Sequence, residues 1–223
     1  DLAAKARNYN AQSLLYYDYY NWEKIVECSL FAAECYHTLG NIDNYVLMLC
    51  RAAEGYALLG DKDGLNRHLS ECQRLLDAIN NTSKAYYYSV YLTHNNEGLS
   101  KVTTSVIDNY LNIVSDEEVD WIVVANAYLT IGNVASAKAA LDNLQHQNKQ
   151  NNDSYYAILT RILKAEGSYK NALETYEYYN KITDSLDFVR LSQDTQFIEE
   201  RHQLEMATIK EQEKKKQIIA VFA

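Results

Sequence analysis

The chain is 223 residues long, contains no proline and only seven glycines, and carries a formal net charge of −9. Average usage would place roughly eleven prolines in a chain of this length. Because proline breaks helices but is common in the turns of sheet proteins, its absence favours an all-helical chain with short connections. The acidic charge argues against a nucleic-acid-binding surface, which needs clustered Lys and Arg.

Helical patterning runs almost continuously over residues 2–182, interrupted by short turn signals. These signals predict ten segments of about 14 to 19 residues, a normal length for globular helices. We expect Asp116, Glu117 and Glu118 to lie in the first turn of a helix, where acids complement the helix dipole. Asp153 and Ser168 are expected to cap helix N-termini. The turn signals are Asn21, Gly40-Asn41, Gly60-Asp61, Asn80 to Ser83, Gly98, Ser115-Asp116, Gly132-Asn133, Asn148 to Asp153 and Gly167-Ser168.

Four glycines each end one helical segment and open another, with spacings of 38, 34 and 35 residues. A period near 34 residues is typical of helix–turn–helix repeats that bury their apolar faces by stacking on one another. Gly40 has similar neighbours but lies only 20 residues before Gly60, so we expect only one of these two to be a turn inside a repeat. The four regularly spaced glycines are Gly60, Gly98, Gly132 and Gly167.

The residues around these turns resemble the tetratricopeptide repeat. One segment reproduces its order of aromatic, large apolar, small, aromatic, glycine, small and large apolar residues. A second match begins at Gly167, and looser copies surround Gly60 and Trp22. The chain departs from the family pattern because it lacks the proline at each repeat's end and matches poorly around Gly98. The best match is formed by Trp121, Val124, Ala125, Tyr128, Gly132, Ala137 and Leu141.

The resemblance implies an all-α fold: a right-handed α-solenoid of about five TPR-like helix pairs over residues 1–182, followed by a long C-terminal helix. In tetratricopeptide domains the first helix of each pair lines the concave groove. Polar side chains there bind a peptide's carboxylate or backbone, or form a solvated polar face. The resemblance places five residues at groove-facing positions: Arg51, Glu54, Tyr88, Asn126 and Arg161.

Chemical motifs are missing from the sequence. No phosphate loop, dinucleotide fingerprint or nucleophile elbow occurs, so we expect no catalytic residue, no cofactor and no metal. His68 and Cys72 share a helix face, but two ligands without a third are a weak metal signal. We expect the four cysteines to be small buried hydrophobes. Consecutive tyrosines, as at Tyr86 to Tyr88, cannot all face the core, so some rings must lie at helix seams or on a partner-binding surface.

The character of the chain changes near Thr183. Residues 183–217 are rich in Gln, Glu and Lys and are expected to form a capping and linker helix. The apolar run at 218–223 follows Lys214, Lys215 and Lys216, which indicates the start of a transmembrane segment flanked by cations. The alternative is an apolar tag that docks on the domain itself.

The succession of features along the chain is similar to the sensory region of bacterial membrane-anchored regulators: repeats come first, followed by a polar helix, lysines and an apolar run. That resemblance implies a LuxR-type transcription regulator or, as an alternative, a histidine kinase; an assembly scaffold or co-chaperone also stays open. It further implies a peptide or protein partner, or self-association, with the repeats in the periplasm or, alternatively, in the cytoplasm. This segment itself is expected to bind no nucleic acid and to meet a membrane through its C-terminal end.

Overall fold

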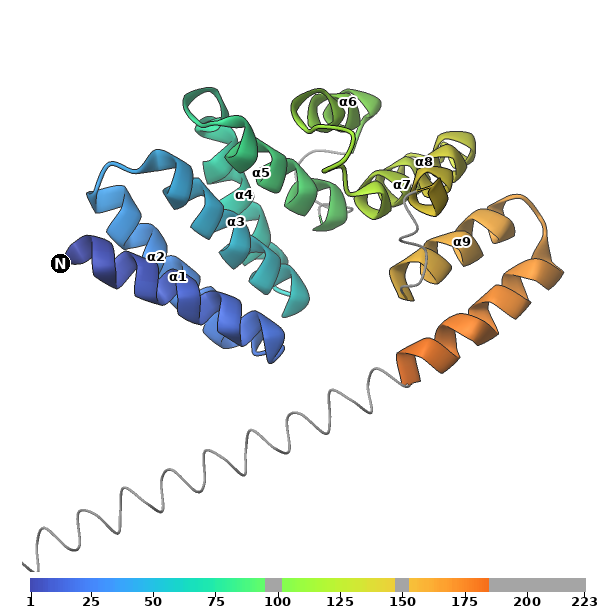
Figure 1. Ribbon diagram of the computed structural model, residues 1–223, viewed down its shortest axis with the longest axis horizontal. Coiled ribbons are helices and arrows are strands. Elements are labelled where there is room, and N and C mark those ends of the chain that lie inside the picture. Colours follow the sequence, from blue (N-terminus) through green and yellow to red (C-terminus); the bar gives the residue numbers. More distant parts are fainter. Residues whose placement is uncertain (95–101, 147–152, 185–223) are drawn as a thin grey trace, which may run out of the picture. The chain divides into compact units, whose positions relative to one another are not determined.

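The computed structural model describes residues 1–94, 102–146 and 153–184. These residues are helical with short connections and contain no strand, which confirms the all-α class. The helices, labelled in Figure 1, are α1 (Leu2–Asp18), α2 (Trp22–Thr38), α3 (Ile42–Leu58), α4 (Lys62–Arg74), a 3-10 turn (Leu76–Ala78), α5 (Asn81–His94), α6 (Thr104–Ile113), α7 (Trp121–Thr130), α8 (Val134–His146) and α9 (Asp153–Ala165), and residues 169–184 are helical as well.

Asp1–Tyr179 form one compact unit, and Asn180–Ala223 form a second, of which residues 180–184 are described. The expected turn at Gly98, nearly all of the expected linker helix over 183–217 and the apolar run at 218–223 lie outside the described residues. Among the helices that are described, none has both the length and the apolar character that crossing a bilayer requires.

One turn geometry connects successive helices at five places. The second residue after the helix adopts a left-handed conformation, with φ of 71° at Gly40 and 54° at Tyr20. Tyr20 is the one such residue that is not glycine among those described. The next N–H then donates to the carbonyl five residues back, as from Asn41 to Tyr36 at 3.0 Å, which is the Schellman pattern. The corresponding bonds run from Asn21 to Tyr16, Asp61 to Tyr56, Asn133 to Tyr128 and Ser168 to Leu163.

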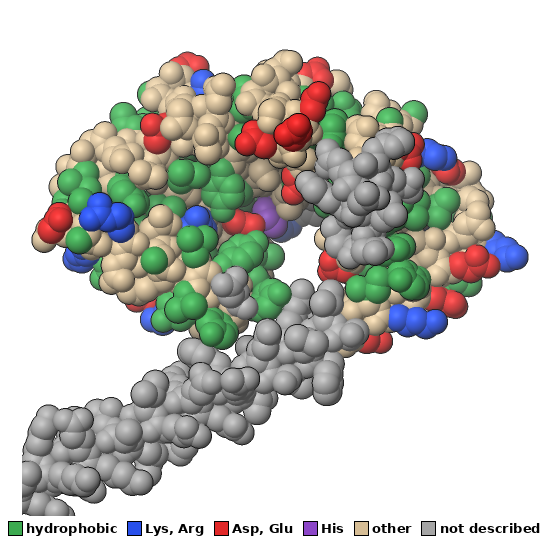
Figure 2. All heavy atoms as spheres, in the orientation of Figure 1, with side chains coloured by type: hydrophobic (Ala, Val, Ile, Leu, Met, Phe, Trp, Pro, Cys, Tyr) green, Lys and Arg blue, Asp and Glu red, His purple; other side chains and the backbone are tan. Residues whose placement is uncertain are grey.

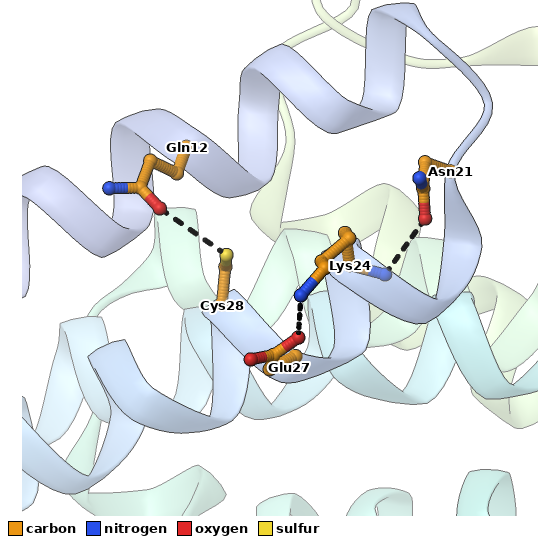
Figure 3. Close-up of polar contacts among 5 residues, drawn as sticks. All are labelled: Gln12, Asn21, Lys24, Glu27 and Cys28. Carbon is orange, nitrogen blue, oxygen red and sulfur yellow. Dashed lines mark hydrogen bonds and ion pairs between the residues drawn. The ribbon is translucent and has the colours of Figure 1, made fainter. Parts of the chain in front are cut away.

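The residue that completes a turn also begins the next helix. The side chain of Asn41 accepts a hydrogen bond from the backbone N–H of Asn44 at 3.1 Å, so it is the N-cap of α3. Figure 3 shows the same arrangement between α1 and α2, where the side chain of Asn21 accepts from the N–H of Lys24 at 3.1 Å. Because one residue does both jobs, consecutive helices reverse direction without a spacer.

The same turn occurs at both Gly40 and Gly60. The two glycines have φ of 71° and 76°, one between α2 and α3 and one between α3 and α4. The expectation that only one of them lies inside a repeat stays a prediction, because equivalent turns do not show how the helices divide into repeats.

The connection before α7 also differs from the expectation. Asp116, Glu117 and Glu118 lie in a turn, not in a helix, and Asp120 caps α7 by accepting from the N–H of Ile122 at 3.0 Å. The helix does not begin at these acids, because Val119, directly after them, is buried in the core. As a result α6 and α7 have 10 residues each, fewer than the segment lengths expected from sequence.

Two further expectations concern helix starts. Asp153 is the first residue of α9 and does not precede it, whereas Ser168 directly precedes the helix at 169–184. The carbonyl of Ser168 accepts from the N–H of Ala172 at 3.0 Å.

Small residues let α2 and α3 approach closely. Ala32, Ala33, Ala52 and Ala53 are almost fully buried, as helix pairs with short interaxial distances require. A Cβ added at Gly55 of α3 would lie 2.7 Å from Cγ2 of Val26 in α2, which is closer than real contacts allow.

We expect Gly40→Ala to lower the free energy of unfolding by about 1 kcal/mol, because an L-residue is strained in the left-handed region. Nothing lies within 4 Å of an added Cβ at this position, so the loss measures backbone strain alone. Gly40→Asn should cost less, since asparagine enters this region more readily. Urea unfolding of the three proteins checks this, and equal losses for the two variants would contradict it.

Candidate binding surface

Alternate helices of the first unit pack on one another from α3 onward. α3 contacts α5, α5 contacts α7, and α7 contacts α9, whereas α4, α6 and α8 each pack most closely on the helix that precedes them. The five residues expected at a groove all lie on this alternate set: Arg51 and Glu54 on α3, Tyr88 on α5, Asn126 on α7 and Arg161 on α9.

Glu54 joins three helices through its carboxylate. One oxygen accepts from the hydroxyl of Tyr17 on α1 at 3.0 Å, and the other accepts from the hydroxyl of Tyr86 on α5 at 3.0 Å. Hydrogen bonds to a charged acceptor are stronger than neutral ones. The carboxylate therefore fixes the positions of α1 and α5 relative to α3.

Arg51 lies one turn before Glu54 and bonds to α1. Its Nη1 donates to Oδ1 of Asn10 at 2.6 Å and to Oγ of Ser13 at 2.8 Å. Ser13 is fully buried and also donates to the carbonyl of Asn10 at 2.8 Å. Both acceptors are neutral oxygens, so these contacts hold the guanidinium in place without neutralising its positive charge.

The tyrosines of this network titrate abnormally. Burial, followed by the charge of Glu54 and the hydrogen bond to it, raises the pKa of Tyr17 to about 12. Burial and the charge of Glu54 also raise the pKa of Tyr86, while the positive charge of Arg51 opposes this shift. Both hydroxyls therefore remain protonated donors to the carboxylate at neutral pH.

A pocket of about 310 Å³ opens at this network. Its walls are mostly apolar, and Figure 2 shows hydrophobic side chains gathered over α1, α3 and α5 with isolated charged side chains among them. Leu14 is about half exposed, at 51 % of its surface, so an apolar group can reach it from solvent. The lining residues are Leu14, Tyr17, Leu47, Arg51, Glu54 and Tyr86.

The other expected site residues lie in different surroundings. Nη1 of Arg161 donates to Oδ1 of Asn126 at 2.5 Å, which links α9 to α7 on an exposed surface. Tyr88 is half-buried and packs edge-on against Tyr87, with 5.2 Å between ring centroids. The structure therefore brings together Arg51 with Glu54, and Asn126 with Arg161, while Tyr88 is part of neither pair.

Sequence analysis missed the residues of α1 and α5 that complete the pocket. Tyr17 and Tyr86 belong to the tyrosine clusters, but the sequence does not show that their hydroxyls meet one carboxylate. Leu14 and Leu47 resemble ordinary helix-seam residues. A usable signal was Ser13, a small polar residue on the buried face of a helix, which needs a polar partner nearby.

The described residues hold no group of three or more potential metal ligands. His68 is buried, its Nδ1 lies 2.7 Å from the carbonyl oxygen of Gly64, and its ring stacks on Tyr56 at 5.3 Å. All four cysteines are free and buried, as expected. Further pockets of about 420 and 380 Å³ lie between α5 and α6 and beside Trp121, respectively.

The raised pKa of Tyr17 predicts a loss of stability in alkali. The unfolded tyrosine loses its proton near pH 10, whereas the folded one keeps it until about pH 12. Its stabilising contribution is therefore complete below pH 10 and is lost as pH rises through 12. In urea unfolding at increasing pH, the free energy of unfolding should fall less steeply for Tyr17→Phe than for wild type.

Tyr169→Phe is the matched control, because Tyr169 is 68 % exposed and belongs to the same residue type. The free energy of unfolding of Tyr169→Phe should fall with increasing pH as steeply as that of wild type. If Tyr17→Phe keeps the wild-type slope, then Tyr17 does not hold its proton in the folded state as described.

The chain was compared with protein-family models, with curated proteins and with solved structures. No family model, no curated protein and no solved structure matches it.

Proposed function

We propose that residues 1–182 form a TPR-like α-solenoid that binds a peptide or protein segment along the face of α1, α3 and α5. One observation carries this proposal: Arg51 and Glu54 line a mostly apolar pocket that opens to solvent, and side chains of α1 and α5 hold them in place. Pockets with apolar walls and a few oriented polar groups are typical of ligand-binding sites.

A peptide suits this surface better than a small metabolite. The apolar part of the pocket, formed by Leu14 and Leu47, accepts one hydrophobic side chain. Arg51, Glu54 and the neighbouring Tyr86 then offer both donors and acceptors to a peptide backbone. A second polar pair, Asn126 with Arg161, lies further along the alternate helices and extends the surface to more than one residue of an extended ligand.

The regulatory part of the proposal rests on the sequence resemblance. In it the segment senses a peptide or protein for a membrane-anchored transcription regulator and relays the bound state through the C-terminal helix expected over residues 183–217. A histidine kinase sensor and a membrane-anchored assembly scaffold or co-chaperone are the alternatives. The reading frame after Ala223 separates them: about 15 further apolar residues, then a DNA-binding or kinase domain, support a sensor. A stop soon afterwards favours the scaffold.

Selection from a random peptide display library tests the binding proposal. We expect an enriched class of peptides carrying a large apolar residue, with micromolar affinity by calorimetry. Leu47→Asp should weaken the binding of an enriched peptide about tenfold or more, because a charge then lies in the apolar part of the pocket. Arg51→Gln should weaken it as well.

The matched control is Arg67→Gln, since Arg67 is exposed on α4, which is not one of the alternate helices. It removes the same charge and should leave the affinity unchanged. Circular dichroism confirms that each variant is folded. No enriched peptide, or equal affinities for Leu47→Asp and Arg67→Gln, would rule out this surface.

A further inference from the structure

Two of the four cysteines lie against each other inside the first unit. Cys50 of α3 and Cys72 of α4 are both 0 % exposed, and their Sγ atoms are 3.6 Å apart. Sγ of Cys72 also lies 3.9 Å from the carbonyl oxygen of Val46. The proposed peptide site uses neither thiol, so this pair requires its own explanation.

The pair has a favourable arrangement for a covalent bond. A disulfide holds its sulfurs about 2.05 Å apart, so the two Sγ atoms must approach by about 1.5 Å. Both side chains point into one interface between two helices that the Gly60 turn connects directly.

The remaining cysteines lack this arrangement. Cys28 and Cys35 lie seven residues apart on α2, roughly 10 Å along the helix axis, and two cysteines at that separation cannot bridge. Figure 3 shows that Sγ of Cys28 points toward α1, where it lies 3.7 Å from Oε1 of Gln12.

We propose that Cys50 and Cys72 are an oxidisable pair that forms a disulfide between α3 and α4. The oxidant is a small-molecule disulfide such as oxidised glutathione. The thiolate of one cysteine attacks a sulfur of the oxidant, breaks its S–S bond and releases one thiol. The second cysteine then loses its proton and attacks the protein sulfur of this mixed disulfide, which forms the Cys50–Cys72 bond and releases the second thiol. Two protein thiols are oxidised and one disulfide is reduced.

Burial controls the rate of this reaction. It raises the pKa of the Cys50 thiol well above its ordinary value, and the thiolate is the reactive form. Because neither sulfur touches solvent, the oxidant reaches them only when α4 separates from α3. Oxidation should therefore be slow in the native protein, and a low concentration of urea should accelerate it.

The bond would hold α3 against α4 and close a loop between residues 22 positions apart. A cross-link of this length stabilises mainly by restricting the unfolded chain. Cys50 directly precedes Arg51, so the covalent bond would also anchor the segment that carries the pocket residues.

The test uses the whole chain incubated with excess oxidised glutathione, then acidified, unfolded and alkylated. We expect two of the four thiols to become protected. Trypsin cuts after Arg51, Lys62 and Arg67, so it separates Cys72 from Cys50 and leaves a linked peptide pair. Because Cys28, Cys35 and Cys50 stay together in the peptide 25–51, fragmentation of the linked pair by tandem mass spectrometry assigns the bonded cysteine. The melting temperature of the oxidised protein should exceed that of the reduced protein by about 5–10 °C.

Variants assign the bond. Cys28→Ala/Cys35→Ala should keep the linked peptides and the shift in melting temperature, whereas Cys50→Ala should lose both. Four thiols still open to alkylation, or a linkage that includes Cys28 or Cys35, would overturn the proposal. If Cys50→Ala does not fold, the peptide map of the wild type and of the double variant still decides. Peptide binding does not enter these measurements, so their failure leaves the pocket proposal intact.

Discussion

The left-handed residue that follows five of the described helices is the constraint on which the rest of the structure depends. With φ near 75° at Gly60, Gly132 and Gly167, the chain satisfies the last carbonyls of one helix and places an Asn, Asp or Ser where it begins the next. Because this connection contains no additional residues, the two helices that it joins must lie antiparallel and in contact. That geometry packs α2 against both α1 and α3, and α3 in turn lies beside α5.

A polar network then selects the rotation of these helices. Glu54 would be costly to desolvate alone, but it accepts from Tyr17 and Tyr86, while Arg51 donates to Ser13. Turning α1 by one residue, about 100°, would move Asn10 and Ser13 away from Arg51 and Tyr17 away from Glu54, so the hydrogen bonds between α1 and α3 would be lost. Apolar packing tolerates several rotations of a helix, whereas this set of hydrogen bonds fits one.

The helices followed from the sequence because their turn chemistry is local. Gly60 and Asp61 identify a boundary whatever surrounds them, and the absence of proline left few alternatives. The boundary before α7 was wrong, since Val119 is drawn into the core by long-range packing that overrides the preference of Glu117 and Glu118 for a helix start. The pocket was predictable only in part. Arg51 and Glu54 were expected from the repeat pattern, but Leu47 was not, and Tyr17 and Tyr86 are 69 positions apart and meet only through tertiary contacts.

Residues 50–55 of α3 connect all of these features. Within this stretch, Cys50 faces Cys72 of α4, Arg51 reaches Ser13 of α1, Glu54 binds Tyr86 of α5, and Gly55 lies against Val26 of α2. Adjacent positions on a helix point about 100° apart, so fewer than two turns are enough to touch four neighbours. Close-packed interiors transmit displacement instead of absorbing it. A movement of α4 therefore displaces the same helix turn that presents Arg51 and Glu54 to the pocket.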